Sequence, residues 1–146
     1  MTKEPTLFAE PVPEPAVKTD PGEWITIPGQ APSKSNIYKV ITLHGHGSLA
    51  KQKALKEYEN AFFWHLPPGM RNLDINGPFE FYIRVYFTSM SHDLDNSLKV
   101  VLDCLQYTKT IRNDNKCAKI VAEKCIDKDN PRIEFRIVEV LRNFSE

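Results

Sequence analysis

Apolar and polar residues alternate most regularly over residues 79–87, which read FEFYIRVYF. Successive side chains of a strand point to opposite sides of the sheet, so this segment has one apolar face and one more polar face. The pattern predicts a strand whose apolar face lies in the core. The apolar face comprises Phe79, Phe81, Ile83, Val85 and Phe87, and the other face carries Glu80, Tyr82, Arg84 and Tyr86.

Four further segments have the composition of strands. A short strand is expected to begin near Trp24 and to stop at Pro28. Residues 37–43, IYKVITL, are rich in β-branched and aromatic side chains. Two more strands are expected at residues 118–126 and 132–141, separated by the turn sequence DKDNP.

Two other segments repeat their apolar residues every three or four positions, which is typical of amphipathic helices. The first is expected to run from Ser48, a candidate N-cap, to Leu66, because Pro67 follows and stops it. The second is expected over residues 94–105. The predicted core positions are Ala54, Leu55, Tyr58, Ala61, Phe62 and Leu66 in the first helix, and Leu94, Leu98, Val101, Leu102 and Leu105 in the second.

The order of these elements predicts an α+β fold, in which two helices pack on one face of a mixed sheet. A chain of 146 residues suits a single domain with its own core. No apolar run reaches the roughly 18–20 residues that cross a bilayer, which excludes a membrane protein. The N-terminal sequence lacks the apolar core of a signal peptide, so a cytoplasmic location is expected.

Residues 1–23 differ in composition from the rest and are expected to form a flexible proline-rich tail, which leaves residues 24–146 as the domain. Five of the 11 prolines lie in this tail, together with two lysines and five acidic residues. The chain as a whole is neutral, so the remainder carries 17 basic and 14 acidic side chains. This small excess is compatible with a polyanionic partner and equally with none. The three cysteines form no CxxC pair, which argues against a disulfide framework and a thiolate zinc site.

One segment, HDLDNSLK at residues 92–99, combines the side chains of a metal site. Asp93 and Asp95 flank a single leucine where a strand gives way to a helix, so in an extended chain both carboxylates point the same way. Lys99 follows Asp95 by four residues and lies above the same helix face. Two neighbouring carboxylates repel unless a cation lies between them, and oxygen ligands suit Mg²⁺.

A structural interpretation of the same residues remains open. An aspartate before a helix is a common N-cap, and Asp95 with Lys99 could form an ordinary surface pair. His92 could assist proton transfer or have no part in chemistry. Asp103, one turn after Lys99, could orient that lysine or be an ordinary surface acid.

A third acid follows the second predicted helix. Asp114 lies in the sequence RNDNK, at a junction that can fold back beside the start of the helix. The pattern DLDNSLKVVLD followed by RNDN resembles the motif of the RusA-type Holliday junction resolvases. That motif consists of an aspartate, any residue, an aspartate–asparagine pair, a lysine, and a later acidic pair before a strand. Asp93, Asp95, Asn96 and Lys99 match its first part, and Asp114 matches the second acid of the later pair, where Asn113 replaces the first.

The resemblance extends to residues 32–39, PSKSNIYK, which are similar to the family's N-terminal stretch of proline, serine, asparagine, aromatic and basic residues. It covers roughly residues 24–141. Phosphate contacts would supply most of the affinity for DNA, although each basic residue could equally be an ordinary solvated side chain, and Asn36 a turn residue. The candidate DNA-binding residues are Lys34, Asn36, Lys39, Arg112 and Lys116, with Lys51, Lys53 and Lys109 as further phosphate contacts.

The resemblance implies a homodimeric endonuclease of a bacterium, phage or prophage that cuts opposing strands of a four-way DNA junction in recombination and repair. Asp93, Asp95 and Asp114 would hold Mg²⁺, with Mn²⁺ as a substitute ion, and Lys99 would stabilise charge on the phosphate. Because Asn113 departs from the motif, a non-catalytic module that binds branched DNA is the alternative. A metal-stabilised domain unrelated to DNA is a third reading of the residues.

Overall fold

The computed structural model describes residues 24–32 and 45–140, with side chains in the first helix from residue 53 onward. Within these residues, four strands and two helices follow one another, with two short 3-10 helices between them. They are β1 (Ile25–Pro28), α2 (Gly45–His65), η1 (Pro68–Met70), β2 (Phe79–Phe87), α3 (Leu94–Tyr107), η2 (Asp114–Lys116), β3 (Cys117–Ile126) and β4 (Arg132–Glu139).

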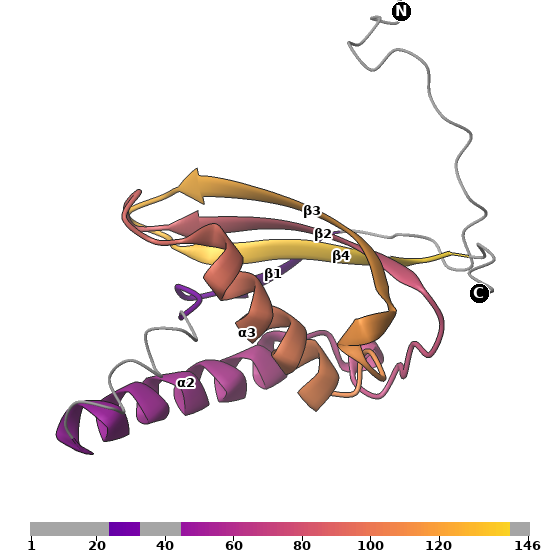
Figure 1. The fold of residues 1–146 in the computed structure, drawn as a ribbon, viewed down its shortest axis with the longest axis horizontal. Coiled ribbons are helices and arrows are strands. Elements are labelled where there is room, and N and C mark those ends of the chain that lie inside the picture. The colour runs from indigo at the N-terminus through magenta and orange to yellow at the C-terminus, as the bar shows by residue number, and fades with distance from the viewer. Residues whose placement is uncertain (1–23, 33–44, 141–146) are drawn as a thin grey trace, which may run out of the picture.

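The strands form one mixed sheet in the order β1-β4-β2-β3 (Figure 1). β2 and β3 are parallel, with Phe81 opposite Ile120, and α3 makes the crossover between them. β4 is antiparallel to both β2 and β1. β3 therefore lies at one edge of the sheet, where the side chains of Ile120, Val121 and Ile126 are exposed.

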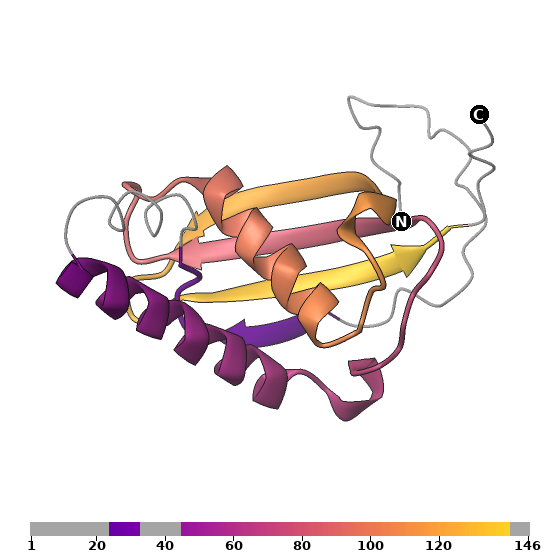
Figure 2. The same cartoon turned by 60° about the horizontal axis from the view of Figure 1, so that its bottom comes forward.

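Both helices cover the same face of the sheet (Figure 2), as an α+β fold of this type predicts. The apolar face of β2 lies in the core between sheet and helices, where Phe79, Phe81 and Val85 are fully buried. α3 adds Val101 and Leu105, while Leu94 and Leu98 are only partly buried.

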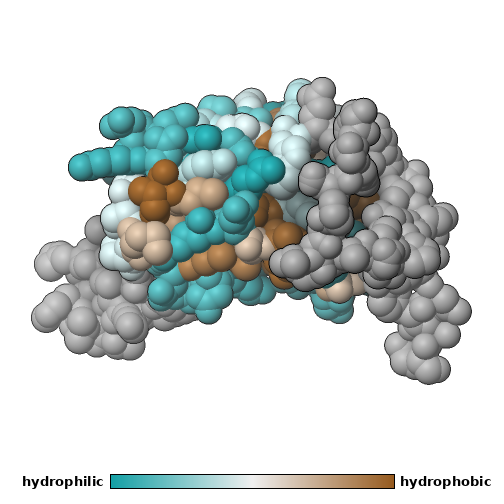
Figure 3. All heavy atoms as spheres, turned by 90° about the horizontal axis from the view of Figure 1, so that it is seen from above, coloured by the Kyte–Doolittle hydropathy of each residue, from teal (hydrophilic) through white to brown (hydrophobic). Residues whose placement is uncertain are grey.

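Figure 3 looks at the side of the sheet that faces away from the helices, where mainly hydrophilic residues surround a few hydrophobic ones. Arginines lie over aromatic rings on this face: Arg84 over Trp24 at 4.0 Å from the ring centre, and Arg132 over Tyr86 at 3.8 Å. Such contacts let the polar side of the sheet pack closely while its charges keep contact with water.

The structure confirms the predicted strand at residues 79–87 and corrects two details of the first helix. α2 begins at Gly45 rather than at Ser48. Ala54, predicted to be buried, is exposed, because the core stripe of this helix is formed by Tyr58, Phe62 and Leu66. The strand expected at residues 37–43 and the tail at residues 1–23 lie outside the described residues.

Within the described residues, no helix is long and apolar enough to cross a membrane.

Candidate active site

The site begins where the chain turns from β2 into α3. Asp93 is the N-cap residue of α3, with extended backbone (φ −94°, ψ 127°), but its side chain caps no backbone N–H. Its Oδ2 instead accepts a hydrogen bond from Nδ2 of Asn96, 3.2 Å away. Asp95 lies in the first turn of α3 and is exposed. Neither carboxylate is therefore used as a conventional helix cap, and both are accessible to a ligand.

Lys99 is the centre of the ionic contacts in this region. Its Nζ donates to Oδ2 of Asp114 at 2.8 Å and lies 3.3 Å from Oδ1 of Asp103. The structure thus pairs Lys99 with Asp103 and Asp114, and not with Asp95 as the surface-pair interpretation required. Hydrogen bonds to Asp114 and Asp103 raise the pKa of Lys99 above its ordinary value. Lys99 is consequently a cation at neutral pH and cannot serve as a general base.

Asp114 is held from two sides. It opens η2, and its backbone N–H donates to Oε1 of Gln106 on α3, 2.9 Å away. The preceding Asn113 caps η2, because its Oδ1 accepts the backbone N–H of Asn115 at 3.0 Å. The junction after α3 does fold back on the helix, but it meets Lys99 and Gln106 rather than the first turn.

Sequence reasoning missed Gln106. The only signal was its spacing, since Lys99, Asp103 and Gln106 follow one another at four and three residues and so share one helix face. The partner of Gln106 lies eight residues away in a different element, so nothing in the local sequence indicates the contact.

Two candidate DNA-binding residues have different surroundings. The guanidinium of Arg112 donates to Asp74 through Nε at 3.1 Å and Nη2 at 2.6 Å. Hydrogen bonding to Arg112 lowers the pKa of Asp74 below its usual value, so the pair stays charged. Lys116 is exposed at the end of η2. Lys34, Asn36 and Lys39 lie outside the described residues, as does most of the PSKSNIYK segment.

The ring of His92, next to Asp93, is stacked on Phe87 with ring centres 5.1 Å apart. Its Nε2 lies 3.4 Å from Nε2 of Gln30, whose Oε1 accepts the backbone N–H of Thr88 at 2.8 Å. Gln30 therefore joins the segment after β1 to the turn that carries Asp93.

Carboxylate oxygens are the ligands that Mg²⁺ prefers, so the chemistry of Asp93, Asp95 and Asp114 fits this ion. Among the side chains that the structure describes, however, no three from His, Cys, Asp or Glu are close enough together to hold a metal. In this arrangement Asp114 is occupied by Lys99, while Asp93 and Asp95 lie at the start of the same helix.

The sequence matches the model of the family Endodeoxyribonuclease RusA over residues 28–138. This range contains every described residue of the site. No curated protein sequence matches the chain.

Proposed function

The chain belongs to the RusA endodeoxyribonuclease family, and on that premise we propose that it is a Mg²⁺-dependent endonuclease that resolves four-way DNA junctions by paired, symmetric nicks. The observation that carries the proposal is the 2.8 Å contact between Lys99 and Asp114. It joins the two halves of the motif, which lie fifteen residues apart in the sequence. A homodimer suits this substrate, because symmetric cutting needs two sites related by a two-fold axis.

Asp93, Asp95 and Asp114 would hold the ion. Bound Mg²⁺ polarises a phosphate and makes bound water more acidic, which is the chemistry that hydrolysis of a phosphodiester requires. The contact with Lys99 holds the Asp114 carboxylate against α3. Asp114 is held by two residues of α3: its carboxylate by Lys99 and its backbone N–H by Gln106. α3 therefore supports the site.

Lys99 would stabilise negative charge on the phosphate. Its raised pKa keeps it an ammonium, and its side chain is 57% exposed, so the charge is accessible to a DNA backbone. Asp103 acts as a positioning residue, since its Oδ1 lies 3.3 Å from the ammonium. A fixed charge of this kind acts most strongly where charge develops during the reaction.

The test uses an end-labelled four-way junction beside a linear duplex of the same sequence, each incubated in Mg²⁺ or in EDTA. We expect paired nicks that require Mg²⁺ and spare the duplex. Asp95→Asn should bind the junction like the natural chain but cut it on the order of 100-fold more slowly or worse. Glu123→Gln is the matched control, since its exposed carboxylate pairs with Arg84 on the sheet face away from α3. Normal cutting by Asp95→Asn would refute the proposal.

A second candidate, a branched-DNA-binding module without catalysis, is supported by one observation. Asn113 stands where the family motif has an acid, and its exposed side chain caps η2 by accepting the backbone N–H of Asn115 instead of supplying a carboxylate. A retained mobility shift on the junction with no nicks in either Mg²⁺ or Mn²⁺ would favour this candidate.

A further inference from the structure

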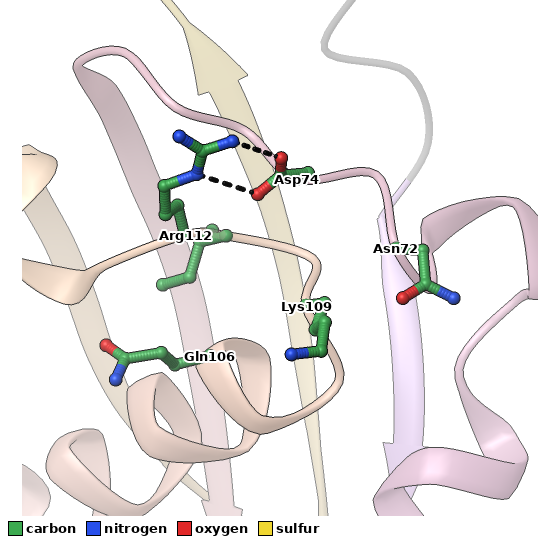
Figure 4. A pocket seen from close by; sticks show the side chains of 6 residues that line it. Asn72, Asp74, Gln106, Lys109 and Arg112 are labelled. Atoms are coloured by element: carbon green, nitrogen blue, oxygen red, sulfur yellow. Dashed lines mark hydrogen bonds and ion pairs between the residues drawn. The ribbon is translucent and has the colours of Figure 1, made fainter.

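A pocket of about 430 Å³ opens beside the candidate active site. It lies between the end of α3, the loop that follows it and the segment before β2 (Figure 4). Gln106 connects pocket and site, because it lines the pocket and also accepts the backbone N–H of Asp114. The pocket is lined by Asn72, Asp74, Gln106, Lys109, Ile111 and Arg112.

The lining combines positive charge with amide groups. Lys109 and Arg112 are cationic, and Asp74 is the one acid, already bonded to Nε and Nη2 of Arg112. The ion pair balances the charge of Arg112 against that of Asp74, so the lining keeps one net positive charge from Lys109. Asn72 and Gln106 add amide groups, which can both donate and accept hydrogen bonds.

Lys109 occupies a backbone position that normally favours glycine. α3 ends in a Schellman motif, in which Thr110 N–H donates to Leu105 O at 3.0 Å and Lys109 N–H donates to Gln106 O at 3.1 Å. In this motif the residue after the C-cap, here Lys109 after Thr108, adopts a left-handed conformation, and Lys109 has φ 61°. Lysine is less favourable than glycine in this conformation, which singles out Lys109 as a candidate for a functional side chain.

A favourable interaction with the negative end of the helix dipole does not explain this position. A lysine anywhere in the last turn of α3 would interact with the dipole and keep an ordinary helical backbone. Two further pocket residues, Asn72 (φ 63°) and Asp74 (φ 55°), are also left-handed. Their backbone N–H groups donate to Thr108 O and Lys109 O, so the two strained segments hold each other in place.

We infer that this pocket is a subsite for one nucleotide of the DNA strand that is cut, with its phosphate on Lys109 and its base or sugar edge on the amides of Asn72 and Gln106. The inference rests on the proposed function, because the strand would pass from Lys99 into the pocket across Gln106. The pocket suits a nucleotide splayed from the strand and is too small for a duplex.

Lys109→Gly tests the inference without damage to the fold, since glycine adopts the left-handed backbone freely. We expect an unchanged or higher melting temperature, junction binding about tenfold weaker, and a salt dependence of binding reduced by about one phosphate contact. Lys128→Gly, in the exposed turn after β3, is the matched control and should alter binding by less than twofold. Equal binding by both variants would overturn the inference.

A second measurement separates this inference from the proposed function. The Asp95→Asn protein, labelled with ¹⁵N, is titrated with each deoxynucleoside 5′-monophosphate while the side-chain amide signals of Asn72 and Gln106 are followed. Shifts that disappear in Lys109→Gly would support the subsite even if no junction is ever cut. Junction cleavage by the natural chain, with no shift of these amides by any nucleotide, would overturn the subsite and leave the proposed function intact.

Discussion

Asn113 uses its Oδ1 to accept the backbone N–H of Asn115, and an aspartate at this position would accept the same bond. The substitution Asn113→Asp should therefore keep the free energy of unfolding within about 0.5 kcal/mol of the natural chain. It also adds a carboxylate beside Asp114. We expect the natural chain and Asn113→Asp both to cut the junction in Mg²⁺, measured by strand-nicking assays on the end-labelled substrate. Cutting by the variant alone would show that the natural chain is the non-catalytic module.

At the level of single residues, the sequence indicated the residues of the motif but not their contacts. The spacing of Lys99 from Asp114 indicated that the two belong to one site, and the structure brings them within 2.8 Å. The pairing of Arg112 with Asp74 could not be predicted, because the two residues are 38 positions apart in loops without a repeating pattern. Contacts of this kind depend on how two loops meet, which periodicity does not describe.

Among the elements, β2 and β4 are joined by a polar cluster on the side of the sheet away from the helices. Oε1 of Glu134 on β4 accepts from Arg84 at 3.1 Å and from Tyr86 at 3.3 Å, both on β2, and its Oε2 accepts from Arg132 at 3.0 Å. Burial raises the pKa of Glu134, but the hydrogen bonds from Arg132 and Arg84 outweigh it, so the pKa lies below its usual value of 4.5. The ionised carboxylate therefore stabilises the folded chain.

Glu134→Gln should lower the free energy of unfolding at pH 7 by roughly 1–2 kcal/mol, since one charged acceptor of several hydrogen bonds is lost. A group with a lowered pKa stabilises above its unfolded pKa and loses that effect as the pH falls through the folded value. The difference between variant and natural chain should thus begin to shrink once the pH falls below the usual value of 4.5, and vanish below the lowered pKa of Glu134 in the folded chain. Urea unfolding of both proteins, at pH 7 and at an acidic pH, measures the difference in the free energy of unfolding.

The control for this prediction is Glu57→Gln on α2. Glu57 lies 3.8 Å from Lys53 in an exposed i,i+4 pair, so its loss should cost less than about 0.5 kcal/mol at either pH. A Glu134→Gln effect that is no larger, or that persists at acid pH, would contradict the assigned role of Glu134.

The elements themselves were largely predictable, because one face of each is buried and the burial repeats with the period of the strand or helix. β2, β3, β4 and α3 lie within a few residues of their predicted bounds. α2 begins earlier than predicted, since Gly45, His46 and Gly47 have poor helix propensity and a local reading places the start at Ser48. Tertiary packing regularly overrides such weak preferences.

For the whole molecule, the sequence predicted the class of fold and the layer of helices, but not the order of the strands. A hydrophobic pattern shows which face of a strand is buried and carries no information about its neighbour. The order β1-β4-β2-β3 places the last strand of the chain inside the sheet, next to β2. It also puts the parallel pair β2 and β3 at one edge, so the α3 crossover with its acids and Lys99 lies on the outer half of the sheet.

The edge position of β3 has a consequence for the exchange of its backbone hydrogens with solvent. Within the described residues β3 pairs only with β2, and successive N–H groups of a strand point to opposite sides, so every second one faces away from β2. We expect hydrogen–deuterium exchange along residues 117–126 to alternate between slow and fast amides, whereas β2 should exchange slowly throughout. Uniform slow exchange in β3 would contradict a free edge and would show that a further segment of the chain, or a second copy of it, pairs with this strand.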